Sequence, residues 1–155
     1  MVPISCRAAC AFVLRQAGRS YEVLLLERAD SLVGTWCQVA GSIEEGETAW
    51  QCVLREIAEE TGLIPHALWS ADYCEQFYVA AKETIEIIPV FVAFVDADCT
   101  VTLNEEHSDH VWLPFEQARE KVSFSSQRSA LSHIEAEFIL REPPHHLLIQ
   151  QDDAP

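Results

Sequence analysis

Residues 48–62 constrain the fold more than any other stretch, because they predict one short helix with both ends marked. Thr48 and Gln51 form the sequence pattern of a capping box, and Gly62 supplies a stop signal. Four apolar residues then recur with the spacing of one helix face: Ala49, Cys52, Val53 and Ile57. An apolar helix face needs a partner surface, so we expect this helix to pack against a sheet.

The sequence before this helix predicts strands. Residues 5–14 and 21–27 are apolar runs joined by a turn-like segment that contains Gly18, which together predict a β-hairpin. The segment WCQVAGS, which begins at residue 36, predicts a short strand ending at Gly41. The helix is therefore expected to follow a hairpin and a short strand.

The second half of the chain predicts more strands and the remaining helices. Two longer strands are expected at residues 69–80 and 84–97, where Pro89 indicates an edge position or a bulge. The other elements are a brief strand at 111–114, a short helix at 115–122 and a longer helix at 125–142. The sum is an α+β fold with a mixed sheet, because strands and helices do not alternate as in a βαβ series.

The domain organisation follows from the absence of any repeat or linker in the sequence. With 155 residues, of which 49% are hydrophobic, the chain can bury the core of one domain. We expect that domain to span residues 1–142 and to be followed by a loosely held tail at residues 143–155.

Composition and charge exclude several classes of function. A formal net charge of −15, with only ten Lys and Arg, argues against a basic groove for nucleic acid. No run approaches the roughly 18 apolar residues of a membrane span, and the N-terminus is a poor signal peptide. We therefore expect a cytoplasmic protein with reduced cysteines, no membrane partner and no nucleic-acid partner. His107 and His110 lack a metal-binding spacing and are expected in a loop rather than in a zinc site.

Three carboxylates of the predicted helix lie close together. Glu56 and Glu60 are one turn apart on the same side, and Glu59 lies beside them. Arg55 is rotated by about 100° from Glu56 and is not expected to neutralise all three. Hard divalent cations take oxygen ligands, so this cluster suits Mg²⁺. Taken alone, such a fragment is more often a solvated acidic face of a helix.

The larger pattern is more specific than this fragment. The fixed residues follow the signature G-x5-E-x7-R-E-U-x-E-E-x-G-U, in which U is a bulky aliphatic residue. They are Gly41, Glu47, Arg55, Glu56, Ile57, Glu59, Glu60, Gly62 and Leu63. By this signature the chain resembles the Nudix hydrolase family. The resemblance implies the Nudix fold, an α/β/α sandwich in which the helix packs on a central mixed sheet.

The resemblance also implies roles for the residues of the signature. It implies that Mg²⁺ or Mn²⁺ binds the side chains of Glu56, Glu59 and Glu60 and the backbone carbonyl of Ala40. The framework residues are then Gly41, Glu47, Arg55 and Gly62. We expect Glu47 to pair with Arg55 and so to hold the preceding loop against the helix. Gly41 is expected to provide a sharp turn where a side chain would crowd the metal.

Outside the signature, the chain is similar to one subgroup, the bacterial dihydroneopterin triphosphate pyrophosphatases. Glu106-His107 precedes Trp112-Leu113, and S-x-R-S-A begins the last helix at Ser126, as in that subgroup. The match implies that Glu106 is a further metal ligand or a general base. A solvated loop acid is the alternative, and the adjacent Glu105 is a second choice for the same role.

Three residues are predicted to meet the substrate. Arg28 and Arg7 are candidates for phosphate contacts, since a guanidinium binds phosphate through two nitrogens. Trp36 is a candidate for stacking on a base or pterin ring. Each has a plain alternative, which is a surface role for the two arginines and a core position for Trp36.

The activity implied by the family is hydrolysis of an anhydride bond by water attack on phosphorus. We expect cleavage of a nucleoside or pterin triphosphate to the monophosphate and pyrophosphate, with Glu56, Glu59 or Glu106 as general base. The alternative substrates are a dinucleoside polyphosphate, ADP-ribose or a nucleotide sugar. A nucleotide sensor without activity is a further alternative, and the family is often dimeric, so a homodimer is also possible.

Overall fold

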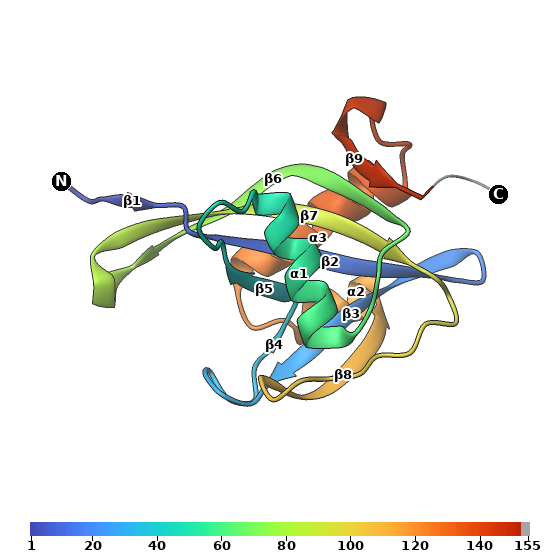
Figure 1. The fold of residues 1–155 in the computed structure, drawn as a ribbon, viewed down its shortest axis with the longest axis horizontal. Helices are drawn as coiled ribbons and strands as arrows, with labels where there is room; N and C mark the ends of the chain where they lie inside the picture. The colour runs from blue at the N-terminus through green and yellow to red at the C-terminus, as the bar shows by residue number, and fades with distance from the viewer. Residues whose placement is uncertain (153–155) are drawn as a thin grey trace.

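A computed structural model of the protein describes residues 1–152 (Figure 1). The strands are β1 (Ile4–Ser5), β2 (Ala8–Ala17), β3 (Ser20–Arg28), β4 (Trp36–Cys37), β5 (Val39–Ser42), β6 (Ala67–Val79), β7 (Thr84–Val95), β8 (His107–Pro114) and β9 (Leu148–Gln151). The helices are α1 (Ala49–Thr61), α2 (Phe115–Lys121) and α3 (Ser125–Ile134). The short helical turns are η1 (Ala80–Lys82), η2 (Glu135–Ile139) and η3 (His145–Leu147).

The strands form one mixed sheet. The predicted hairpin is confirmed, since β2 and β3 pair antiparallel around Gly18. On its other side β2 runs parallel to β7, and β7 pairs antiparallel with β6. At the ends of the sheet, β8 pairs with β3 and β9 pairs with β6. A mixed sheet was predicted, and this order confirms it.

The hairpin strands separate beyond their turn, and residues 36–42 fill the gap. Near the turn β2 and β3 pair directly, for example Leu14 with Val23. Farther along, β3 pairs with β4, and β2 pairs with β5. One short strand was predicted here, whereas the structure has two that serve different partners. The loop that leads into α1 starts at the end of β5.

The sheet has a hydrophobic core on each face, because successive side chains of a strand point to opposite sides. In β2, Ala9, Ala11 and Val13 face the same core as the α1 residues Val53 and Ile57. The alternate residues of β2 face the core that contains Leu131 and Ile134 of α3 and Phe115 of α2. Figure 1 shows α1 on the near side of the sheet and α3 behind it. The protein is therefore the predicted α/β/α sandwich.

Helix α1 has the caps that its sequence predicts. The Thr48 side chain accepts a hydrogen bond from the Gln51 backbone N–H, and the Gln51 side chain accepts one from the Thr48 N–H. At the other end Gly62 has a φ of +70°, the left-handed conformation typical of a C-terminal cap. Because both ends are fixed by local hydrogen bonds, the acidic side of α1 is held in a defined register.

Pro89 marks a bulge, not an edge. It lies in β7, which has partners on both sides, so the edge alternative is wrong. The pairing of β6 with β7 shifts register between Ser70 and Cys74, and Cys74 lies opposite Pro89. Asp72, inside this bulge, has a φ of +53°. A proline is tolerated at such a position because the regular hydrogen-bond ladder is already interrupted there.

The C-terminal segment differs from the expectation of a loosely held tail. Residues 145–151 form η3 and β9, and β9 pairs antiparallel with the first residues of β6. The last predicted helix is also shorter, since α3 ends at Ile134 and continues as the π-helical turn η2. The part of the expected tail at residues 153–155 lies outside the described residues. Within residues 1–152, no helix is long and apolar enough to cross a membrane.

Candidate functional site

The site begins where β5 passes closest to α1. A Cβ atom on Gly41 would lie 2.1 Å from the Cδ atom of Glu56, so only glycine leaves room for this carboxylate. Gly41 itself is the third residue of β5 and does not have a positive φ. The expected sharp turn at Gly41 is therefore wrong, and close approach of backbone to side chain explains the glycine instead.

Arg55 and Glu47 form the predicted pair that holds the loop against the helix. The Arg55 Nε and Nη2 atoms donate to the two Glu47 carboxylate oxygens at 2.8 and 3.0 Å. Glu47 also accepts a hydrogen bond from the Glu44 backbone N–H, which closes the loop. The hydrogen bonds from Arg55 lower the pKa of Glu47 to about 2. Glu47 is thus an anion that anchors the loop.

Arg55 also reaches two of the three carboxylates, Glu56 and Glu59, which agrees with the expectation that it does not neutralise all three. Its Nη1 atom lies 2.7 Å from Glu56 Oε1 and 3.3 Å from Glu59 Oε2. Glu59 follows Arg55 by four residues, a spacing that makes the two neighbours on the surface of a helix. Burial raises the pKa of Glu56, and Arg55 opposes that shift. Glu59 is exposed and held by Arg55 at only the longer distance.

Glu60 is the most deeply buried carboxylate of the site. Glu60 is 1% exposed, and its Oε2 atom has no hydrogen-bond partner within residues 1–152. Burial, followed by the nearby charges of Glu56 and Glu106, raises the pKa of Glu60 to about 9. An unpaired buried carboxylate destabilises a fold unless a cation or proton neutralises it. Glu60 is therefore placed to hold a cation.

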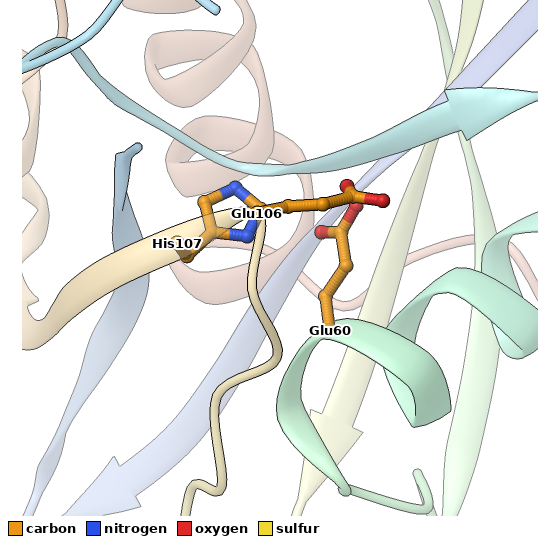
Figure 2. Close-up of side chains that lie close together, drawn as sticks. All are labelled: Glu60, Glu106 and His107. Atoms are coloured by element: carbon orange, nitrogen blue, oxygen red, sulfur yellow. The ribbon is translucent and has the colours of Figure 1, made fainter. Parts of the chain in front are cut away.

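Glu106 and His107 approach Glu60 from the start of β8 (Figure 2). One possible ligand atom from each of Glu60, Glu106 and His107 lies within 4.8 Å of the others. The Glu106 carbonyl accepts a hydrogen bond from the Ala29 N–H, which fixes this segment beside the end of β3. Glu106 rather than Glu105 is thus the acid that joins the cluster. Both predicted loop histidines, His107 and His110, instead lie in β8.

The donor set fits a divalent cation. Carboxylate oxygens from Glu56, Glu60 and Glu106 are the ligands that Mg²⁺ and Mn²⁺ prefer. The unpartnered Oε2 atom of Glu60, judged over the described part of the chain, is the observation that favours occupancy. Ala40 is exposed and follows Val39 in β5, paired with Cys10 of β2. Its carbonyl as a ligand stays a prediction.

The predicted substrate-binding residues are not all in one place. Arg28 ends β3, where its charge opposes the rise in the pKa of Glu60 that burial causes, and its Nε atom donates to the Ser31 carbonyl at 3.0 Å. Trp36 packs against the core on the α3 side, with the Lys121 ammonium 4.3 Å from its ring centre. The core alternative for Trp36 is therefore favoured over stacking on a substrate ring.

Arg7 lines a cavity of about 630 Å³ between β1, β5 and the β6–β7 hairpin. Lys82 and the aromatic ring of Phe77 also line it, and Ser42 forms its border with the acidic site. The Ser42 carbonyl accepts a hydrogen bond from Arg55 Nη2 at 3.0 Å. Ser42 thus lies between two cationic side chains of the cavity and Arg55, which contacts the carboxylates of α1.

A second buried carboxyl group lies on the opposite face of the sheet and was missed from sequence. Glu75 of β6 is 4% exposed, and its Oε1 atom accepts a hydrogen bond from Gln38 Nε2 at 2.9 Å. Its Oε2 atom accepts one from Ser126 at 3.1 Å, and Gln127 donates to Gln38 Oε1 at 2.8 Å. Burial raises the pKa of Glu75. This network ties β6 and α3 to the residue just before β5.

Comparison with known proteins identifies the family to which the chain belongs. Residues 5–134 match the model of the NUDIX domain. The chain belongs to the Nudix family. Its Nudix domain and its hydrolase relatives support an enzyme that acts on phosphoric anhydrides.

Two tetraphosphatases are among the similar proteins. The chain is 30% identical over 112 residues to the asymmetrical bis(5'-nucleosyl)-tetraphosphatase of Rattus norvegicus, which covers 71% of this chain and 76% of that protein. A structure of a C. elegans Ap4A hydrolase binary complex has a TM-score of 0.72 and 25% identity, covering 83% of this chain and 94% of the other. Against the octanoyltransferase of Myxococcus xanthus, the chain is 29% identical over 137 residues but spans only 38% of that protein.

One of the similar structures belongs to the subgroup that the sequence resembles. The E. coli dihydroneopterin triphosphate pyrophosphohydrolase has a TM-score of 0.67 and 24% identity, covering 84% of this chain and 92% of the other. At this level of identity the likeness concerns the Nudix fold alone. The specific subgroup is thus a matter for experiment.

Proposed function

We propose that this Nudix chain is a metal-dependent hydrolase that cleaves an anhydride bond in a dinucleoside polyphosphate. The observation that carries the proposal is the buried Glu60 carboxylate, which faces Glu106 and, in the part of the chain that the structure describes, leaves one oxygen unpaired. A cation in this cluster would neutralise charge on a polyphosphate that the chain, at −15, otherwise repels.

The protein's own residues account for the chemistry around such a cation. A bound divalent cation polarises the phosphate and lowers the pKa of the attacking water. Arg55 holds Glu47 and Glu56 in place, so the loop and the helix keep one geometry. Glu59 and Glu106 are exposed, and each can take the proton from water. The water oxygen bonds to phosphorus as the anhydride P–O bond breaks, and the leaving phosphate keeps the electron pair.

The choice of substrate class rests on similarity and on the neighbouring cavity. The rat relative is named for bis(5'-nucleosyl) tetraphosphates, which have a nucleoside at each end. Arg7 and Lys82 line a cavity of about 630 Å³ that offers cations for phosphate and Phe77 for a base, with the acid Glu86 also in its lining. A pterin or nucleoside triphosphate is the second candidate, favoured by the Glu106-His107 and Ser126 features of the sequence.

Product analysis with Mg²⁺ tests this proposal. The panel contains diadenosine tetraphosphate, dihydroneopterin triphosphate, dATP and ADP-ribose, with Glu56→Gln as the impaired control. We expect the dinucleotide to be cut into unequal halves at the highest kcat/KM. Release of pyrophosphate from the pterin triphosphate at a higher kcat/KM would replace the substrate assignment with the second candidate. No turnover of any compound would overturn the enzymatic function.

A matched pair of variants tests the cavity. Arg7→Gln and Lys82→Gln are expected to raise KM for diadenosine tetraphosphate by about tenfold each, because each removes one charged hydrogen bond of about 1.5 kcal/mol. Arg19→Gln, at the exposed hairpin turn on the far end of β2, serves as the charge control. Equal KM values for all three variants would exclude the cavity from substrate binding.

A further inference from the structure

His107 is a buried imidazole with an unexplained nitrogen. The residue is 8% exposed, and its Nδ1 atom finds no hydrogen-bond partner anywhere in residues 1–152. A buried polar atom in this state costs about 1–3 kcal/mol unless something outside the chain satisfies it. Figure 2 shows the His107 ring beside the Glu60 carboxylate, with Glu106 directly adjacent.

His107 lies at an irregularity in the pairing of β3 with β8. Pairing of β3 with β8 shifts register between Glu27 and Arg28, and the shifted pair is Arg28 with His107. Such an irregularity redirects the side chains next to it. The Ala29 N–H then binds the Glu106 carbonyl, so the segment before β8 is fixed as well. Two consecutive residues from one strand end thereby reach the same carboxylate of α1.

Two residues that each carry an unsatisfied buried atom therefore belong to one small cluster. Glu60 Oε2 and His107 Nδ1 are the only two buried side-chain atoms of residues 1–152 without a hydrogen-bond partner, and both residues belong to one cluster. Two independent packing defects would not be expected to fall in the same cluster. A shared ligand that accepts electron pairs from both an oxygen and a nitrogen accounts for the coincidence.

We propose that His107 is a nitrogen ligand, and that Glu60, Glu106 and His107 form a mixed site for a first-row transition-metal ion such as Mn²⁺. The proposal rests on the metal-dependent function above and adds a preference among metals. Imidazole suits transition metals, whereas Mg²⁺ takes oxygen ligands and retains water. A site with one imidazole should therefore favour Mn²⁺ over Mg²⁺ more strongly than a site made only of the signature carboxylates Glu56, Glu59 and Glu60.

Pulsed electron paramagnetic resonance of the Mn²⁺-loaded full chain tests the ligand directly. A directly bound imidazole gives nuclear modulation from ¹⁴N, and labelling all histidines with ¹⁵N changes that modulation without any substitution. We expect the ¹⁴N modulation in the wild type and its replacement by a ¹⁵N signal in the labelled protein. Tightly bound Mn²⁺ without nitrogen modulation would overturn the proposal.

Variants measure the consequence for metal preference. His107→Gln is expected to weaken Mn²⁺ binding by about 10–100-fold, and to weaken Mg²⁺ binding much less, in direct titrations. His66→Gln, whose side chain is exposed before β6, is the matched control and should bind both ions like the wild type. An unchanged ratio of Mn²⁺ to Mg²⁺ affinity in folded His107→Gln would overturn the proposal.

The two proposals fail in different ways. Hydrolysis of the nucleotide panel with Mg²⁺, in wild type that shows no nitrogen modulation, leaves the enzymatic function standing and removes His107 from the metal. Nitrogen modulation in a protein that hydrolyses nothing supports the metal site and removes the enzymatic function. Circular dichroism of each variant establishes that it is folded before its affinity is compared.

Discussion

Two buried carboxyl groups lie on opposite faces of the same sheet, and they differ in how completely they are hydrogen-bonded. Glu75, on the α3 side, accepts hydrogen bonds at both oxygens from Gln38 and Ser126. Glu60, on the α1 side, lies among other acids and, over the described residues, keeps Oε2 unpaired. Burial raises the pKa of both groups, so burial alone does not separate them. Because only Glu75 is fully hydrogen-bonded, we infer that Glu75 supports the structure, whereas Glu60 is left to bind a cation.

Replacement of Glu60 tests this contrast most strongly. Glu60→Gln should reduce kcat/KM by about 100-fold or more, since loss of a metal ligand removes several kcal/mol of charge stabilisation. The metal-free variant should be at least as stable as the wild type, because it lacks a carboxyl group that, buried beside Glu56 and Glu106, must take up a proton on folding. Activity assays and urea unfolding measure the two effects. Glu120→Gln, an exposed site on α2, is the control.

Gly41→Ala should affect the same site through its neighbour. The new Cβ would meet the Glu56 carboxylate at 2.1 Å and force it away from Arg55. We expect metal affinity to fall by about 10–100-fold, as when a supporting contact of a ligand is lost. Isothermal titration with Mn²⁺ measures this, and an affinity equal to that of the wild type would mean that Glu56 is free to move aside.

Glu75→Leu should affect stability rather than chemistry. The substitution leaves Gln38 and Ser126 with buried donors and no acceptor, at a cost of about 1–3 kcal/mol in the free energy of unfolding. Activity per folded molecule should stay within about twofold of the wild type. Urea unfolding and active-site titration check the two parts. A large loss of kcat at unchanged stability would place Glu75 in the reaction.

The pH dependence of stability should separate the two carboxyls. Because the folded pKa of Glu60, about 9, exceeds its ordinary value of 4.5, its stabilising contribution is complete below pH 4.5 and is lost as pH rises toward 9. The metal-free wild type should therefore lose more stability between pH 5 and pH 8 than Glu60→Gln does. The raised pKa of Glu75 also makes stability fall with rising pH, but it does so equally in the wild type and in Glu60→Gln.

Thermal unfolding with and without Mn²⁺ completes that comparison. A cation at Glu60 should reduce the loss of stability with rising pH in the wild type, because it favours the ionised carboxylate. It should leave the contribution of Glu75 unchanged. Parallel curves for the wild type and Glu60→Gln without metal would contradict the assignment.

Thr48→Ala should have the smallest effect. It removes the side-chain cap that receives the Gln51 N–H and should lower the free energy of unfolding by about 1 kcal/mol. Metal affinity should not change measurably, because the register of α1 is also fixed by Arg55 and Gly62. Urea unfolding and a Mn²⁺ titration provide the two values.

The features predicted from the sequence are those that depend on residues close in the chain. The caps of α1 and the Glu47–Arg55 pair involve partners at most eight residues apart, and the hairpin is a local turn. The signature then places Glu56, Glu59 and Glu60 by helical geometry. Their roles in binding metal and in proton transfer stay predictions.

Most of the missed features depend on distant residues. Gln38 and Gln127 are 89 positions apart, so no local pattern indicates their contact. His107 is buried at a register shift opposite Arg28, whereas the polar residues 107–110 give no sign of a strand. The contact of Arg55 with Glu59 was available from the sequence, because the two are four residues apart on a predicted helix. Beside that contact, the adjacent Glu106-His107 pair was the one other available signal.

The last strand has a practical consequence for anyone who shortens this protein. The family match ends at residue 134, yet Phe138 lies beyond it in the core on the α3 side, and β9 covers the first residues of β6. A version cut at that boundary would lose a core aromatic ring and expose an open strand edge. Such edges recruit strands from other molecules, so the shortened protein should aggregate where the longer one stays dissolved.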